Sequence, residues 1–173
     1  AAFLTGCGGD ETDNGAGGDG NGSGAQVAEH SVGETFEVNQ LTWTVLSCEL
    51  LDEVESLFSD TPPHQPTRGK WLVVTMDFRG REGLSGGYDI AALKVRDHNA
   101  ALYDVAEPGG AADDYRLTHE GVKNLSLAML NNPQAQRVFA IYDVPDAGAP
   151  FTLEWMGADG GTLVTLCRVG LTA

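Results

Sequence analysis

The chain has 173 residues, of which 25 are acidic and 10 are lysine or arginine, so its formal net charge is -15 at pH 7. This excess of negative charge argues against nucleic-acid binding, because too few basic residues are present to neutralise a run of phosphates. Hydrophobic residues make up 42% of the chain, which is enough to build a folded core. No stretch of about 18 consecutive apolar residues occurs, so no transmembrane helix is predicted.

The first residues are interpreted as the end of a signal peptide. Leu4-Thr5-Gly6-Cys7 resembles the lipobox of prokaryotic lipoproteins, in which the cysteine thiol carries a diacylglyceryl group and becomes the mature N-terminus. Residues 1–6 are then the end of the removed peptide, and Cys7 is the expected site of lipid attachment. The alternative is an ordinary cysteine in a tail.

Residues 7–29 are predicted to form the lipidated cysteine and a flexible, acidic, glycine-rich linker. Eight of the 17 residues from 8 to 24 are glycine and four are acidic. Such a segment cannot bury enough apolar surface to offset the entropy lost on ordering, so a disordered tether is expected. The protein is therefore expected at the cell membrane, lipid-anchored and facing the extracellular side.

Two cysteines, Cys48 and Cys167, remain once Cys7 is assigned to lipid. Both lie in strand-like runs, and in an exported chain this even pair predicts a disulfide bond. Loop-closure entropy credits a bridge across so long a loop with roughly 5 kcal/mol. Two reduced thiols and a catalytic cysteine are the alternatives, whereas a zinc site is not predicted because no closely spaced Cys/His set occurs.

From residue 30 onward, the sequence predicts short β-strands separated by turn signals. Alternation of apolar and polar residues marks strands at residues 35–38, 41–50, 70–78, 91–96, 101–105, 137–144, 151–155 and 162–169. About 7–9 strands at this spacing predict an all-β, immunoglobulin-like antiparallel β-sandwich over residues 30–173.

Local patterns add detail to these strands. Asn39-Gln40 and Asp97-His98-Asn99 are predicted turns, and a slip in the alternation at Val45-Leu46 predicts a β-bulge. Residues 50–58 carry apolar side chains at helical spacing, which favours a short helix, and residues 107–135 are expected to be rich in loops. Within that region, residues 117–130 are either strand or helix.

The three tryptophans receive different predictions. Trp43 and Trp71 lie inside strands and are expected in the core, whereas Trp155 lies near a strand end and is expected to be exposed. Leu72, Val74, Met76 and Phe78 alternate along one strand, so they are expected to share its buried face.

Five blocks of the folded region resemble successive blocks of one protein family. They are residues 32–36, 41–45, 69–74, 93–97 and 138–145. The family is the telokin-like, immunoglobulin-like domain of prokaryotic lipoproteins called domain of unknown function 4352, which is similar in fold to a secreted mycobacterial immunoprotective antigen. The resemblance spans about residues 30–157 and implies a β-sandwich. It brings no established catalytic residues.

Candidate site residues are few, because no nucleophile-elbow, zinc-protease, P-loop or dinucleotide motif occurs. Asp113, Asp114, His119 and Glu120 are the candidates for a ligand loop that meets a cation. Each of the four histidines, at positions 30, 64, 98 and 119, is expected to be a solvated loop residue rather than a ligand, and no specific metal site is predicted. Asn21 and Asn124 begin glycosylation sequons.

The sequence therefore predicts a non-catalytic, lipid-anchored domain that binds a protein or a glycan at the cell surface and needs no cofactor. One alternative is an accessory lipoprotein that captures a solute for a transporter, although a single small domain lacks the usual two-lobed cleft. The other is an enzyme with an unrecognised loop site around residues 107–123.

Intact-mass analysis of the protein from its native membrane, with and without reduction, checks these expectations together. We expect a chain that begins at Cys7, carries added lipid and gains a pair of hydrogen atoms when the bond between Cys48 and Cys167 is reduced. An unlipidated chain with all of its thiols free would contradict export and would return Cys48 as a reactive candidate.

Overall fold

The structure is a computed structural model that describes residues 30–106, 110–146, 150–156 and 163–169, with side chains up to Trp155. The predicted signal-peptide end, the lipidation site Cys7 and the linker lie outside the described residues.

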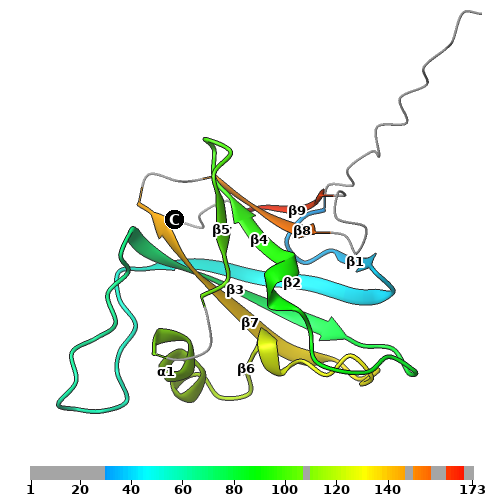
Figure 1. The fold of residues 1–173 in the computed structure, drawn as a ribbon, viewed down its shortest axis with the longest axis horizontal. Helices are drawn as coiled ribbons and strands as arrows, with labels where there is room; N and C mark the ends of the chain where they lie inside the picture. Colours follow the sequence, from blue (N-terminus) through cyan, green and yellow to red (C-terminus); the bar gives the residue numbers. More distant parts are fainter. Residues whose placement is uncertain (1–29, 107–109, 147–149, 157–162, 170–173) are drawn as a thin grey trace, which may run out of the picture.

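Two β-sheets lie face to face, and one helix covers the outer side of the larger sheet (Figure 1). The larger sheet has the order β1-β2-β3-β7-β6, formed by Thr35–Val38, Leu41–Leu51, Gly69–Arg79, Gln136–Pro145 and Lys123–Asn124. The smaller sheet has the order β5-β4-β8-β9, formed by Leu102–Asp104, Leu93–Arg96, Phe151–Met156 and Leu163–Val169. Every pairing between these strands is antiparallel except that of β6 with β7. The predicted β-sandwich is confirmed.

Several local predictions are also confirmed. Asn39 and Gln40 have φ of 53° and 66°, which is the backbone of a tight hairpin turn between β1 and β2. The register of β2 against β3 shifts between Val45 and Ser47, where the sequence predicts a bulge. Asp97 closes the turn between β4 and β5, because its carboxylate accepts hydrogen bonds from the backbone of the turn and from the Tyr103 hydroxyl.

The prediction of a short helix at residues 50–58 is wrong. Strand β2 continues to Leu51, and Val54 then forms an antiparallel bridge with His64 across the loop. Val54 is 4% exposed and packs on the outer face of the larger sheet. The helical spacing of apolar residues in this segment therefore reflects contacts with other elements rather than a helix.

The loop-rich region contains a helix that the sequence reading missed. Helix α1 spans Ala111–Thr118, and its first residue follows Gly110, which makes no side-chain cap. A 3-10 helix at Ile90–Ala92 replaces the start of the strand predicted at residues 91–96. Another 3-10 helix, Leu125–Leu127, forms part of the segment 117–130, which was expected to be strand or helix. The short strand β6 pairs in parallel with β7 just before the second of them.

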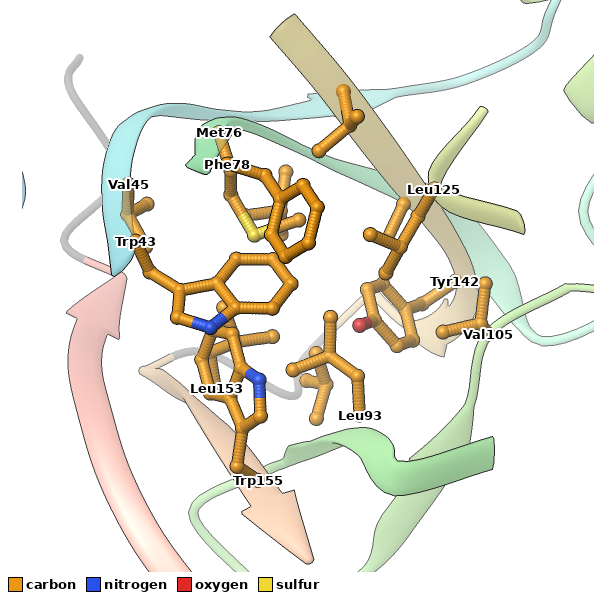
Figure 2. Close-up of a cluster of buried hydrophobic side chains, with 14 of the residues drawn as sticks. Trp43, Val45, Met76, Phe78, Leu93, Val105, Leu125, Tyr142, Leu153 and Trp155 are labelled. Carbon is orange, nitrogen blue, oxygen red and sulfur yellow. The ribbon is translucent and has the colours of Figure 1, made fainter. Parts of the chain in front are cut away.

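The main core lies between the two sheets (Figure 2). Leu72, Val74, Met76 and Phe78 all face it and are fully buried, as their alternation predicts. Trp155 is only 1% exposed, so its expected exposure is wrong. It is buried because its ring packs edge-on against Trp43 from the opposite sheet, with ring centroids 4.8 Å apart.

A second core lies on the outer face of the larger sheet. Trp71, Val73, Phe139 and Ile141 point to this side of β3 and β7, where α1 covers them with Tyr115 and its first alanines. Strands β3 and β7 are thus buried on both faces. This explains why their sequences contain continuous apolar runs as well as alternation.

Three buried polar atoms in the main core lack a hydrogen-bond partner among the described residues. They are the indole nitrogens of Trp43 and Trp155 and the hydroxyl of Tyr142. Tyr142 is fully buried, and this burial is the main reason why the pKa of its hydroxyl is raised. A buried hydroxyl without a partner costs free energy, because it has given up its hydrogen bonds to water.

Tyr142→Phe is therefore expected to raise the free energy of unfolding by about 1 kcal/mol, because it removes an unpaired hydroxyl from the core. Urea denaturation of the variant and the wild type measures the difference. Tyr103→Phe is the matched control. It removes a hydroxyl that donates to Asp97 at 2.9 Å, so it is expected to lower stability. A loss of stability in Tyr142→Phe would show that the hydroxyl has a partner in solution.

Candidate functional site

The site that stands out is a hollow of about 200 Å³ between the end of β2, the segment that follows it and α1. We call it the α1 hollow. It is lined by Glu49, Leu51, Glu53, Val54, Glu55, Tyr115, Thr118 and His119. Its walls thus combine three carboxylates with two aliphatic side chains and two rings.

The end of β2 supplies one wall through its two-residue periodicity. Cys48 and Leu50 pack against the main core, so Glu49 and Leu51 lie on the outer face of the sheet, where α1 sits. The bridge to His64 then holds the next part of the wall, with backbone hydrogen bonds of 3.0 and 2.8 Å between Val54 and His64.

Helix α1 supplies the opposite wall. The rings of Tyr115 and His119 stack with centroids 3.9 Å apart, and the Tyr115 hydroxyl donates a hydrogen bond to Glu49 at 2.6 Å. Burial and then the neighbouring Glu49 carboxylate raise the pKa of the Tyr115 hydroxyl well above its usual value, so it stays a donor. Nδ1 of His119 lies 2.9 Å from the Tyr115 carbonyl and donates to it, which leaves Nε2 as an acceptor when the ring is neutral.

A second pair of side chains fixes the loop against the helix. Nε2 of His64 donates to Oδ2 of Asp114 at 2.8 Å, and the same oxygen accepts the backbone N–H of Leu57 at 3.3 Å. The hydrogen bond from His64 is the main cause that lowers the pKa of the Asp114 carboxyl. This pair joins two segments that lie 50 residues apart in the chain.

The four predicted ligand residues do not form one cluster. Asp113 and Asp114 lie in α1 rather than on a loop, and Asp114 is buried against His64. His119 directly follows the last residue of the helix and lines the α1 hollow, and Asp113, His119 and Glu120 are all exposed. Within the part of the chain that the structure describes, no three His, Cys, Asp or Glu side chains are placed to hold a metal ion.

Glu49, Glu53, Glu55 and Tyr115 were missed as site residues. Glu49 lies within β2, Glu53 and Glu55 lie in the segment for which the sequence predicts a short helix, and no local pattern marks Tyr115. Tyr115 and Glu49 are 66 residues apart, so only the folded chain brings them together.

The predicted disulfide falls partly outside the described residues. Cys48 lies on β2 of the larger sheet, and the backbone of Cys167 stands opposite Leu153 in the pairing of β9 with β8. The side chain of Cys167 is not among those described, so the bridge stays a prediction.

The sequon at Asn124 is poorly placed for modification. Asn124 is 3% exposed, and its side-chain oxygen accepts hydrogen bonds from the backbone and hydroxyl of Ser126. The sequon at Asn21 lies outside the described residues.

A second hollow of about 230 Å³ lies beside β5, where the Arg68 guanidinium stands over the Tyr103 ring at 5.3 Å. Its carboxylates already have partners. Asp143 accepts the backbone N–H groups of Thr67 and Arg68 at 2.9 Å, and Asp104 pairs with Lys94. The α1 hollow is the better candidate because, among the described residues, no lysine or arginine lines it and none of its carboxylates forms an ion pair.

Solved structures match this fold at low sequence identity. The yjhA protein from Bacillus subtilis aligns with a TM-score of 0.54 and 16% identity, over 79% of this chain and 99% of its own. MPT63, a secreted protein from Mycobacterium tuberculosis, aligns with a TM-score of 0.52 and 13% identity, over 82% of this chain and 96% of its own. An uncharacterised β-sandwich protein from Clostridium difficile aligns with a TM-score of 0.50 and 12% identity, over 82% and 95%.

These likenesses define the class of protein as a β-sandwich and confirm the predicted similarity in fold to a secreted mycobacterial protein. No family model and no curated protein match the chain, so the lipoprotein family stays a prediction. None of the described helices is long and apolar enough to span a membrane.

Asp114→Asn is expected to lower the melting temperature at pH 7 and to lose this effect in acid. The pKa of Asp114 is depressed in the folded state, so its carboxylate stabilises the fold above its unfolded pKa of about 4. That contribution disappears as the pH falls through the folded pKa. Melting curves from pH 7 down to about pH 2 are therefore expected to converge for variant and wild type.

Asp113→Asn is the matched control, because Asp113 is the exposed neighbour in the same helical turn. It is expected to change the melting temperature little at any pH. A destabilisation of Asp114→Asn that persists unchanged at about pH 2 would contradict a role for the carboxylate charge.

Proposed function

We propose that this chain is a non-catalytic, lipid-anchored domain of the cell surface that binds a protein partner through its α1 end. The α1 end means residues 49–68 together with residues 110–120. The observation that carries the proposal is the α1 hollow, a concave site between a strand and a helix whose three carboxylates form no ion pair with the described residues.

Exposed apolar side chains at the same end favour a protein partner over a glycan. Leu57, Phe58 and Leu117 are 43%, 70% and 53% exposed. The backbone of Leu57 is bonded to Asp114 of α1, and Leu117 follows one turn later in the same helix. Large apolar side chains that stay in water at one end of a domain are typical of a surface that another protein covers.

The lipobox and the acidic linker support the anchor. Residue 30 leads into β1, which lies at the other end of the sandwich from α1 (Figure 1). A lipid on Cys7 would therefore attach the domain at the end away from α1, so that the anchor would not cover the α1 end. The likeness in fold to a secreted protein agrees with an extracellular site of action.

Solute capture and catalysis have less support. The α1 hollow is smaller than the roughly 300–1,000 Å³ that ligand pockets usually enclose, which argues against solute capture. The His64–Asp114 pair resembles acid–base machinery, but here it holds the loop against the helix.

Site-specific photo-crosslinking on intact cells tests the proposal. With benzoylphenylalanine in place of Phe58, we expect one discrete adduct, because this side chain is the most exposed apolar group at the α1 end. The same probe at Glu37, which is exposed on β1, is the control and is expected to give none.

Competition makes the result specific. An excess of soluble full-length chain carrying Cys7→Ser is expected to remove the adduct, because it occupies the partner without joining the membrane. Equal crosslinking from both positions, or an adduct that the competitor leaves unchanged, would contradict binding through the α1 end.

A further inference from the structure

We propose that the α1 hollow receives an arginine side chain presented by the protein partner. This inference rests on the proposed function and names the chemistry that the partner brings to the site.

The negative charge of the hollow favours the binding of a cation. Glu49, Glu53 and Glu55 line it, no lysine or arginine does, and none of the three forms an ion pair among the described residues. The nearby Lys70 is already shared by Asp52 and Asp146. Negative charge in a concave, partly apolar site concentrates the potential there and raises the local concentration of cations.

The apolar walls and the volume of the hollow favour an organic cation. Leu51, Val54 and the Tyr115 ring offer apolar surface, which suits the methylene stem of a long basic side chain. A volume of about 200 Å³ suits one such side chain rather than a whole small-molecule ligand. A bare metal ion does not fit, because no three acidic, histidine or cysteine side chains of the described region converge on a point.

The acceptors in the hollow favour arginine over lysine. A guanidinium presents five N–H donors in a plane, whereas an ammonium presents three around one nitrogen. One carboxylate oxygen of Glu49 accepts a hydrogen bond from Tyr115, and one of Glu53 accepts a hydrogen bond from Gln65. The second oxygen of each carboxylate can accept a hydrogen bond from a ligand. Glu55 and Nε2 of His119 add further acceptors on the same rim.

The hollow is also preorganised. The bond from Tyr115 to Glu49 fixes one carboxylate, the stack with Tyr115 fixes His119, and the Thr118 hydroxyl donates to backbone carbonyls of α1. Side chains that are held before binding lose less entropy when the ligand arrives. Glu49 and His119 are therefore already held in place before a ligand binds.

A titration with short peptides tests the proposal. The ¹⁵N-labelled full-length Cys7→Ser chain is titrated with acetyl-Gly-Arg-Gly-amide and, separately, with the same peptide carrying lysine or the neutral isostere citrulline. We expect saturable amide shifts at Val54, Glu55, Tyr115 and His119, with affinity for the arginine peptide about tenfold above that for the citrulline peptide. Weaker binding of the lysine peptide is expected from its smaller donor set.

Matched variants separate the site from the overall charge. The double variant Glu53→Gln/Glu55→Gln is expected to weaken binding of the arginine peptide about tenfold. The double variant Glu37→Gln/Glu82→Gln removes the same charge at two exposed positions outside the hollow and is expected to leave binding unchanged. Equal weakening by both variants, or equal binding of arginine and citrulline peptides, would overturn the proposal. Equal or tighter binding of lysine would overturn the choice of arginine.

The peptide titration and the crosslinking fail independently. An adduct at position 58 with no arginine binding in the hollow would overturn this inference and leave the proposed function standing. Arginine binding in the hollow with no competed adduct on cells would overturn the proposed function.

Discussion

The structure depends on the burial of strands β3 and β7 on both faces. They pair over ten residues from Gly69 opposite Pro145 to Phe78 opposite Gln136, and their inner side chains form the core between the sheets. Their outer side chains form a second core that α1 and Val54 cover, with Leu51, Ala106 and Val122 packed against it. An uncovered outer face would leave Trp71, Phe139 and Ile141 in water, so the helix and the loop that meets it are part of the hydrophobic balance of the fold.

The candidate site is a consequence of that covering. Helix α1 must lie on the sheet to bury Tyr115, and this brings the Tyr115 hydroxyl to Glu49 at the end of β2. The loop between β2 and β3 meets the helix on this face, and the His64–Asp114 bond joins the two. The α1 hollow lies where these elements meet, so the contacts that complete the second core also set the geometry of its rim.

The sequence predicted those parts of the fold that depend on neighbours in the chain. The alternation in β3, the Asn39-Gln40 turn and the bulge after Val45 are local patterns with local causes. Burial of Trp155 and the path of residues 52–66 are not local, because each depends on a partner in another sheet or segment. The sequence did not predict helix α1, because the residue before the helix is Gly110, which has no side chain to form an N-cap hydrogen bond. His119 was the predicted residue that lines the hollow, whereas its carboxylates required the pairing of distant segments.

The distribution of the few basic residues gives the α1 end its character. Arg96 pairs with the buried Glu154, Lys94 with Asp104 and Arg137 with Asp77, so these cations are bound to acids across the faces of the two sheets. Lys70 is held near the α1 end by Asp52 and Asp146, which leaves it unable to neutralise the rim of the hollow. The chain has 25 acids and 10 bases, so it holds more carboxylates than its own basic residues can pair with. Those of the hollow are set against apolar walls and a fixed pair of rings, where a cation from outside the chain gains most from them.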